Sequence, residues 1–159
     1  MENSYSGSEI VQMGIEIEKN GKAFYDTLTA KTTHDDAKKI FEYLSYEEEK
    51  HIDAFQRILN TVQQYEQPEN YTGEYFDYMN ALAKEHVFTQ ANKGVEIAEK
   101  IKDDKEAIAI AKKFESDSII FYEGMKKAVS EKEHKLLDML IGQEREHLEK
   151  LTFIEKVVG

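Results

Sequence analysis

Four long segments of the sequence carry apolar residues at alternating intervals of three and four, and each segment places a glutamate within that apolar stripe. The segments cover residues of about 8–31, 35–65, 105–129 and 131–158. This spacing puts the apolar residues on one face of an α-helix, as in the seam of a helical bundle. The chain of 159 residues has one proline and eight glycines, so few residues interrupt such helices. The sequence therefore predicts an all-α four-helix bundle, with residues 1–159 as a single domain.

The links between the segments predict how the helices are connected. Residues 32–36 and 130–133 are short links, so each pair of helices should form an antiparallel hairpin. Ser130 and Glu133 fit a capping box at the start of the last helix. A long crossover of about 66–104 joins the hairpins. A short helix is expected at 74–85, and one or two helical turns are expected at 93–102. A connection of this length can run along the bundle and set the second helix parallel to the third.

The glutamates within the apolar stripes carry the strongest chemical signal. Each takes a core position, and in two of the segments a histidine follows three residues later. Four buried carboxylates at one level would repel one another, and these stripes contain no lysine or arginine. A cluster of metal ions is the natural compensating charge. The candidate ligands are Glu18, Glu48, His51, Glu115, Glu144 and His147.

The two halves of the sequence repeat one another. Each half contains a Glu-x6-Tyr segment followed by a Glu-x-x-His segment, and matching residues lie 97 or 96 positions apart. A lone Glu-x-x-His is a weak signal, since Glu131 and His134 also fit it in the first turn of the last helix. There we interpret it as capping and solvated charge. The matched pairs are Glu18 with Glu115, Tyr25 with Tyr122, Glu48 with Glu144, and His51 with His147.

The spacing and residue types indicate a reactive two-metal site. Residues three apart on a helix share a face, so each Glu-x-x-His pair can bind one metal region. Four carboxylates and two imidazoles match the charge of two divalent ions and leave coordination positions open. These ligands suit iron or manganese and do not exclude zinc. The chain has no cysteine, which excludes thiolate-ligated metals and disulfides.

The overall charge narrows the possible partners and compartments. The formal net charge of −11 argues against binding to nucleic acid or to anionic membranes. No apolar run approaches the roughly 18 residues of a membrane span. The first eight residues lack the basic and apolar pattern of a signal peptide. We therefore expect a cytoplasmic protein.

The motif segments at 18–25, 48–51, 115–122 and 144–147 resemble the rubrerythrin branch of the ferritin-like di-iron carboxylate proteins. The resemblance covers the four long helices, and the crossover is less diagnostic. It implies a ferritin-like bundle with two iron ions and the oxidation of Fe(II) by hydrogen peroxide or O2, as in a peroxidase or ferroxidase. Tyr25 and Tyr122 match tyrosines near the cluster, which could donate hydrogen bonds to ligand carboxylates or supply an electron. Which carboxylates bridge the metals is left open.

The sequence departs from the typical rubrerythrin pattern at two points. Typical members carry a rubredoxin-like domain with four cysteines, and this chain has none. Electrons for peroxide reduction would therefore come from a separate donor, such as a rubredoxin-type protein. Typical members also carry an extra carboxylate one turn beyond the third-helix glutamate. Ser118 stands there in this chain, which indicates a plain six-ligand site.

Two other functions fit the same residues. One is ferritin-like iron binding and storage, and the other is a non-catalytic module stabilised by its metal. We also expect a homodimer, in which the long crossover would permit the exchange of hairpins between protomers. His34 and His86 are interpreted as surface or loop histidines. Tyrosines of the crossover region are expected to cover an apolar face or to form a dimer contact: Tyr65, Tyr71, Tyr75 and Tyr78.

Overall fold

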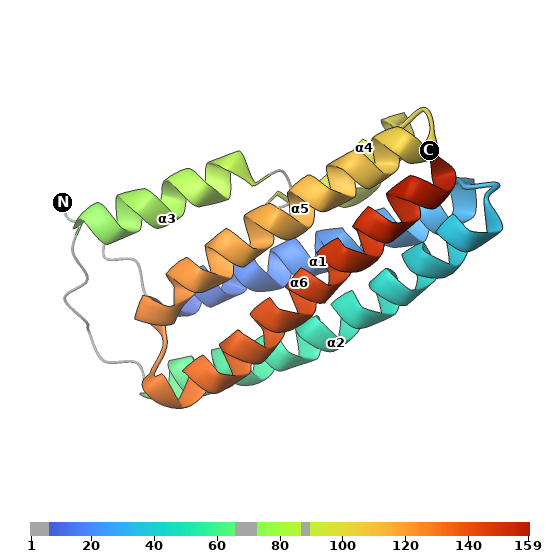
Figure 1. Cartoon of the computed structure of the whole chain (residues 1–159). Coiled ribbons are helices and arrows are strands. Elements are labelled where there is room, and N and C mark those ends of the chain that lie inside the picture. Colours follow the sequence, from blue (N-terminus) through green and yellow to red (C-terminus); the bar gives the residue numbers. More distant parts are fainter. Residues whose placement is uncertain (1–6, 66–72, 87–89) are drawn as a thin grey trace.

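The computed structural model describes residues 7–65, 73–86 and 90–159, and within these ranges the protein is helical (Figure 1). Two short helices of the crossover accompany four long ones, and a 3₁₀ turn follows the third long helix. The predicted all-α four-helix bundle is confirmed. The long helices are α1 (Gly7–Lys31), α2 (Asp35–Tyr65), α5 (Asp104–Met125) and α6 (Glu131–Val158). The short ones are α3 (Gly73–Glu85) and α4 (Lys93–Lys100), and the 3₁₀ turn η1 is Lys126–Ala128.

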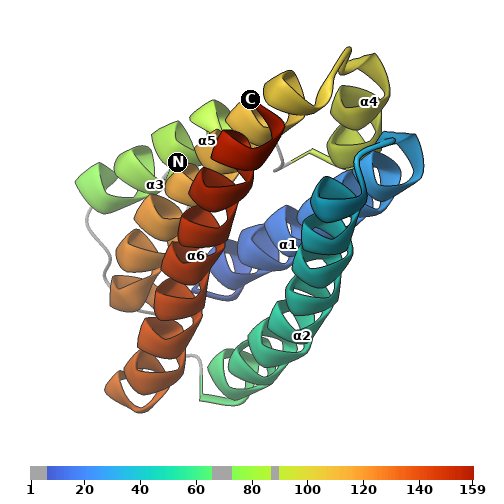
Figure 2. The ribbon, with the colours of Figure 1, turned by 45° about the vertical axis from the view of Figure 1, so that its right-hand side comes forward.

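The long helices pair as two antiparallel hairpins that face one another. Helix α1 packs on α2 and α5 packs on α6, and the hairpins meet through α1 with α5 and α2 with α6. Helices α2 and α5 run in the same direction, as Figures 1 and 2 show. Along the crossover, α3 packs on α5 and α4 packs on α1. The connection therefore extends along the bundle, as its length predicts.

Helix α4 is held closely against α1 by hydrogen bonds. The Asn20 side chain accepts from the backbone N–H of Gly94 at 2.9 Å and donates to the carbonyl of Gln90 at 2.8 Å. A Cβ atom on Gly94 would lie 2.0 Å from the carbonyl oxygen of Asn20, so the close approach requires glycine. The Lys31 ammonium donates to three carbonyls at the end of α4 and just beyond it. These contacts fix the second half of the crossover to the first hairpin.

The start of α6 differs from the predicted capping box. Ser130 stands at the N-cap position, but its side chain makes no capping hydrogen bond. The Glu133 N–H donates to the Ser130 carbonyl instead, at 2.9 Å, and exposure of Ser130 lets water satisfy the first N–H groups. His134 forms a hydrogen bond with the carbonyl of Lys126 at 2.7 Å, which ties α6 to the turn before it. The turn itself ends α5 at Met125, four residues earlier than predicted.

The crossover tyrosines divide between core and surface. Tyr75 is buried and donates a hydrogen bond to the carbonyl of Gly124 at 2.7 Å, so it covers α5. Tyr78 is half exposed. Tyr71 and the side chain of Tyr65 lie outside the described residues. In the described part of the chain, every helix is too short or too polar to cross a membrane.

Candidate metal centre

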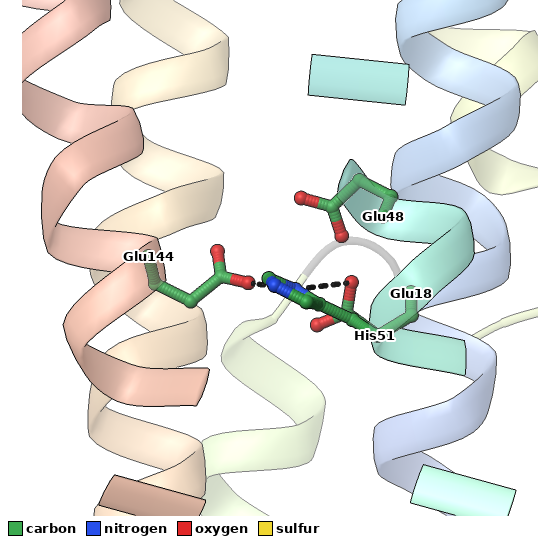
Figure 3. Close-up of side chains that lie close together, drawn as sticks. All are labelled: Glu18, Glu48, His51 and Glu144. Atoms are coloured by element: carbon green, nitrogen blue, oxygen red, sulfur yellow. Dashed lines mark ion pairs between the residues drawn. The ribbon is translucent and has the colours of Figure 1, made fainter. Parts of the chain in front are cut away.

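The six predicted ligands meet at one level inside the bundle. Each long helix contributes at least one carboxylate, and α2 and α6 each add a histidine one turn later. All six side chains are at most 1% exposed. Figure 3 shows four of them converging from three helices. The contributions are Glu18 from α1, Glu48 and His51 from α2, Glu115 from α5, and Glu144 and His147 from α6.

The ligand atoms form two overlapping groups, each with its atoms within 4.8 Å of one another. One group contains Glu18 and His51, and the other contains Glu115 and His147. Glu48 and Glu144 belong to both groups. A carboxylate has two oxygens, so these two glutamates can serve both positions at once. The sequence left the bridging residues open, and Glu48 and Glu144 are the two glutamates that lie within reach of both positions.

The hydrogen bonds agree with this division. Neither oxygen of Glu48 or of Glu144 has a hydrogen-bond partner among the described residues, although all four atoms are buried. Glu18 and Glu115 each use one oxygen in a hydrogen bond and leave only Oε2 without a partner. A buried polar atom without a partner costs free energy, so such atoms are rare in native structures. Glu48 and Glu144, which belong to both groups, thus have two oxygens free for ligation, one for each metal position. Glu18 and Glu115, which belong to one group each, have one.

Tyr25 and Tyr122 supply those hydrogen bonds, and they do so across the two hairpins. Tyr25 of α1 donates to Oε1 of Glu115 on α5 at 2.7 Å, and Tyr122 of α5 donates to Oε1 of Glu18 on α1. Both hydroxyls are fully buried. Burial, followed by the negative charge of the adjacent glutamates, raises the pKa of both tyrosines well above its usual value. Each phenol therefore stays protonated and keeps donating to its carboxylate.

The two histidines present Nδ1 to the cluster. The Nδ1 atom of His51 lies 2.7 Å from Oε1 of Glu144 and 3.5 Å from Oε2 of Glu18. That of His147 lies 3.4 Å from Oε1 of Glu115. Neither Nδ1 has a hydrogen-bond partner of acceptable direction among the described residues. Each Nδ1 thus faces carboxylate oxygens of two or more glutamates, as a ligand of a shared metal position would.

The outer nitrogens of the two histidines have different surroundings. Nε2 of His51 lies 2.7 Å from the side-chain oxygen of Gln143, so the amide accepts its proton and leaves Nδ1 for the cluster. Nε2 of His147 is buried without a partner among the described residues. Gln143 is a site residue that sequence reasoning missed. Its position before Glu144 in the repeated motif, where the first copy has Glu47, was the available signal.

The electrostatics of the site's own side chains show a need for positive charge. Burial and the charge of Glu144 raise the pKa of Glu115 to about 8. Burial disfavours charged histidine, yet Glu18 and Glu144 raise the pKa of His51 to about 12. Against the same burial, Glu115 and Glu144 raise the pKa of His147 to about 10. The glutamates thus favour a positive charge or a proton on each neighbouring group, as a bound cation would satisfy.

The interpretation of His86 as a surface or loop histidine is wrong. The residue follows α3 and is 2% exposed, with Nε2 at 3.0 Å from the Ser118 hydroxyl and its ring against Phe114. Burial lowers the pKa of His86 to about 4, so it is neutral at pH 7. A polar residue after a short helix gave no periodic signal of burial. Ser118, which stands where the resemblance implies an extra carboxylate, therefore contacts His86. The other histidine interpreted in this way, His34, is partly exposed.

The residue set fits a pair of divalent ions. Eight buried atoms without partners surround the two positions, and they belong to carboxylate and imidazole groups. None of the ion pairs that these residues form in the described structure involves lysine or arginine. Oxygen and imidazole donors of this kind suit iron and manganese. The metal-binding role of the six residues stays a prediction, which their geometry supports.

Comparisons with known proteins place this arrangement in a family. The solved structure of a protein described as a ferritin-like di-iron-carboxylate protein, from Thermotoga maritima, aligns with a TM-score of 0.68. The alignment covers 98% of each chain at 23% sequence identity, which shows a shared fold. No curated protein matches the chain significantly. The rubrerythrin family model matches residues 9–154, nearly the whole chain, and the chain therefore belongs to the rubrerythrin family.

Proposed function

We propose that the chain is a di-iron oxidoreductase that oxidises Fe(II) with hydrogen peroxide or O2 and reduces peroxide with electrons from a separate donor. The observation that carries the proposal is the pattern of unpaired buried atoms on six side chains. Rubrerythrin family membership supports iron as the metal. The description of the Thermotoga maritima protein as a di-iron-carboxylate protein supports the same choice.

The residues divide the work of holding two ions. Glu18 and His51 would hold one position, Glu115 and His147 the other, and the oxygens of Glu48 and Glu144 are available to both. A bound iron pair supplies two electrons, which is the number that reduction of one peroxide molecule to water requires. Three or four protein ligands at each position would leave coordination sites open to an oxidant.

The surrounding side chains keep the ligands in place and exclude water. Glu18 and Glu115, each of which belongs to one metal position only, are called the terminal glutamates. Tyr122 and Tyr25 each fix one oxygen of a terminal glutamate, so the other oxygen keeps its direction toward the cluster. Their rings pack on Phe41, Phe114 and Phe55, which surround the site with apolar surface. Such a dry environment strengthens the electrostatic interaction between ligands and ions.

Anaerobic loading with Fe(II), followed by rapid mixing with peroxide or O2, tests the proposal. We expect an absorbance change on mixing with peroxide and consumption of about one peroxide for every two irons. Glu144→Gln should abolish the change, because Glu144 contributes to both positions. Glu146→Gln, on the exposed face of the same helix, is the matched control and should leave it intact. An iron-loaded chain that shows no change with either oxidant would contradict the proposal.

A further inference from the structure

The outer nitrogen of His147 is a buried polar atom that the metal centre leaves unexplained. It has no hydrogen-bond partner among the described residues, and the side chain is only 1% exposed. The outer nitrogen of His51, in contrast, lies 2.7 Å from the side-chain oxygen of Gln143. An imidazole that binds a metal ion through Nδ1 carries its proton on Nε2, and a buried N–H without an acceptor costs free energy. His147 thus requires an acceptor at Nε2 once it serves as a ligand.

The internal repeat identifies the residue at the corresponding place. At the repeat separation of 96, His51 corresponds to His147 and Glu47 corresponds to Gln143. Gln143 and Glu47 each come one residue before a glutamate that belongs to both metal positions, and each lies on the helix opposite the histidine in question. Because the two hairpins repeat one another, the Glu47 carboxylate is the counterpart, for His147, of the Gln143 amide.

Glu47 is engaged by other groups close to His147. Its Oε1 accepts from the Tyr43 hydroxyl at 2.7 Å, and its Oε2 is paired with the Lys50 ammonium at 3.3 Å. The Tyr43 ring in turn lies edge-to-face against the His147 ring, with centroids 6.3 Å apart and planes at 84°. Tyr43 contacts both residues, so Glu47 and His147 lie in the same small region between α2 and α6.

One difference between the two halves accounts for the unequal histidines. At the repeat separation, Tyr43 corresponds to Met139. A thioether has no proton to donate, so nothing one turn before Gln143 competes for its side-chain oxygen, and the amide contacts His51. In the first half, the Tyr43 hydroxyl stands at that place and takes an oxygen of Glu47.

We propose that Glu47 is the positioning residue of His147: when a metal ion occupies the His147 position, the Glu47 carboxylate accepts from Nε2–H of His147 in place of the Tyr43 hydroxyl. The inference rests on the metal centre of the proposed function and is independent of the reaction with peroxide. Glu47 acts through the imidazole and touches neither metal nor oxidant. A carboxylate behind a ligand histidine fixes the ring and makes its other nitrogen a better donor to the metal.

Zinc binding, measured by competition with a coloured chelator, tests the inference without a redox reaction. Glu47→Leu should lower the affinity of one of the two positions by roughly 10–100-fold. Glu47→Gln keeps an acceptor of the kind that Gln143 provides, and should restore most of that affinity. Tyr43→Phe removes the competing hydroxyl and keeps the ring, so the affinity should stay equal or rise. Glu42→Leu, on the exposed face of the same helix, is the matched control and should leave both positions unchanged.

Nuclear magnetic resonance of the zinc-loaded chain with isotope-labelled histidine supplies a spectroscopic signature. The Nε2 proton of His147 should exchange slowly with water and resonate downfield, as a proton donated to a carboxylate does. In Glu47→Leu that signal should move upfield and exchange faster, and in Tyr43→Phe it should stay in place. A signal that is the same in the unmodified chain and in Glu47→Leu would refute the contact.

The outcomes separate this inference from the function of the site. Zinc affinity that falls equally in Glu47→Leu and Tyr43→Phe would overturn the inference, because Glu47 would then act only through Tyr43. Unchanged affinity in Glu47→Leu would overturn it as well. A loss in Glu47→Leu that Glu47→Gln restores, with no loss in Tyr43→Phe, supports it. This zinc result would stand even if the iron-loaded chain failed to react with peroxide, a failure that contradicts the proposed function alone.

Discussion

At the residue scale, hydrogen bonds separate the atoms that face the two metal positions from the atoms that orient them. Glu48 and Glu144 keep both oxygens unpaired, while Tyr25 and Tyr122 each occupy one oxygen of a terminal glutamate. Gln143 adds the same kind of support to His51. Residues that orient ligands in this way are expected to affect metal affinity almost as clearly as the ligands do.

Gln143→Leu tests that expectation at a residue outside the ligand set. Without the amide, the outer nitrogen of His51 loses its acceptor and the ring is no longer fixed with Nδ1 toward the cluster. We expect metal affinity at one position to fall by roughly 10–100-fold. Competition with a coloured chelator measures it. Gln56→Leu, on the exposed face of α2, is the control, and equal affinities in both variants would contradict the role.

His86 provides a second prediction, on the pH dependence of stability. Its pKa in the folded protein is about 4, below the value of about 6.5 in an unfolded chain, so the fold favours the neutral ring. The contribution of neutral His86 to the free energy of unfolding is fully present above pH 6.5 and is lost as pH falls toward 4. The loss between pH 7 and pH 5 amounts to about 2 kcal/mol. Denaturant unfolding of the metal-free protein should show a smaller loss in His86→Leu, and an unchanged loss would refute the assignment.

The sequence predicted all six candidate ligands but not their neighbours, and the reason is periodicity. A glutamate in an apolar stripe is conspicuous, and the repeat excludes chance occurrences such as Glu131 and His134. Gln143 lies beside the stripe, where polar residues are ordinary. His86 belongs to a connection, and its burial depends on how the crossover returns to α5.

At the element scale, glycine positions show where the crossover is fixed to the bundle. Gly94 of α4 lies against the backbone of α1, where a Cβ atom would be 2.0 Å from the carbonyl oxygen of Asn20. Gly142 of α6 has nothing within 4 Å of such an atom. The same substitution should therefore have opposite effects at the two sites.

Gly94→Ala should destabilise the protein by about 1–3 kcal/mol, because backbone atoms must move apart. Gly142→Ala should stabilise it by roughly 0.5–1 kcal/mol, since alanine is the better helix former and meets no neighbour. Thermal unfolding of both variants measures the difference. Equal shifts in the two variants would show that α4 is not packed on α1 as described.

The ends of elements were less predictable than their existence. Long periodic segments gave α1, α2 and α6 within a residue or two of their observed bounds. The 3₁₀ turn after Met125 was not predicted, and neither was the lack of a capping hydrogen bond from the Ser130 side chain. A short link of this length can end one helix and begin the next in several ways. Unlike Ser130, Asp103 at the start of α5 does cap its helix, because its side chain accepts a hydrogen bond from the N–H of Glu106 at 2.8 Å.

At the scale of the whole molecule, two hairpins combine into one charged interior. The sequence predicted this pairing because short links force antiparallel neighbours and the long crossover lets α2 run parallel to α5. The bundle thereby places four carboxylates at one level, in a chain whose formal net charge is −11. Sequence could not predict the cross-hairpin tyrosine bonds, since they depend on how the hairpins face one another.

Metal and pH should affect the stability of this interior in opposite ways. In the metal-free protein, the pKa values of His147 and His51 are raised to about 10 and about 12. Their stabilising contribution is complete below the unfolded pKa of about 6.5 and declines as pH rises through the folded values. Metal ions replace these protons, so metal-loaded protein should gain stability over metal-free protein as pH rises from 6.5 to 9. Melting temperatures of both forms measure this, and parallel pH profiles would contradict it.

The most direct test of the central claim is the metal content of purified chains loaded with Fe(II) and freed of excess by gel filtration. The structure predicts two ions per chain in the unmodified protein, about one in Glu18→Ala and little or none in Glu144→Ala, which removes a ligand of both positions. Glu146→Gln should retain two. An unmodified chain without bound metal, or a Glu144→Ala chain that still binds two ions, would contradict the two-metal centre.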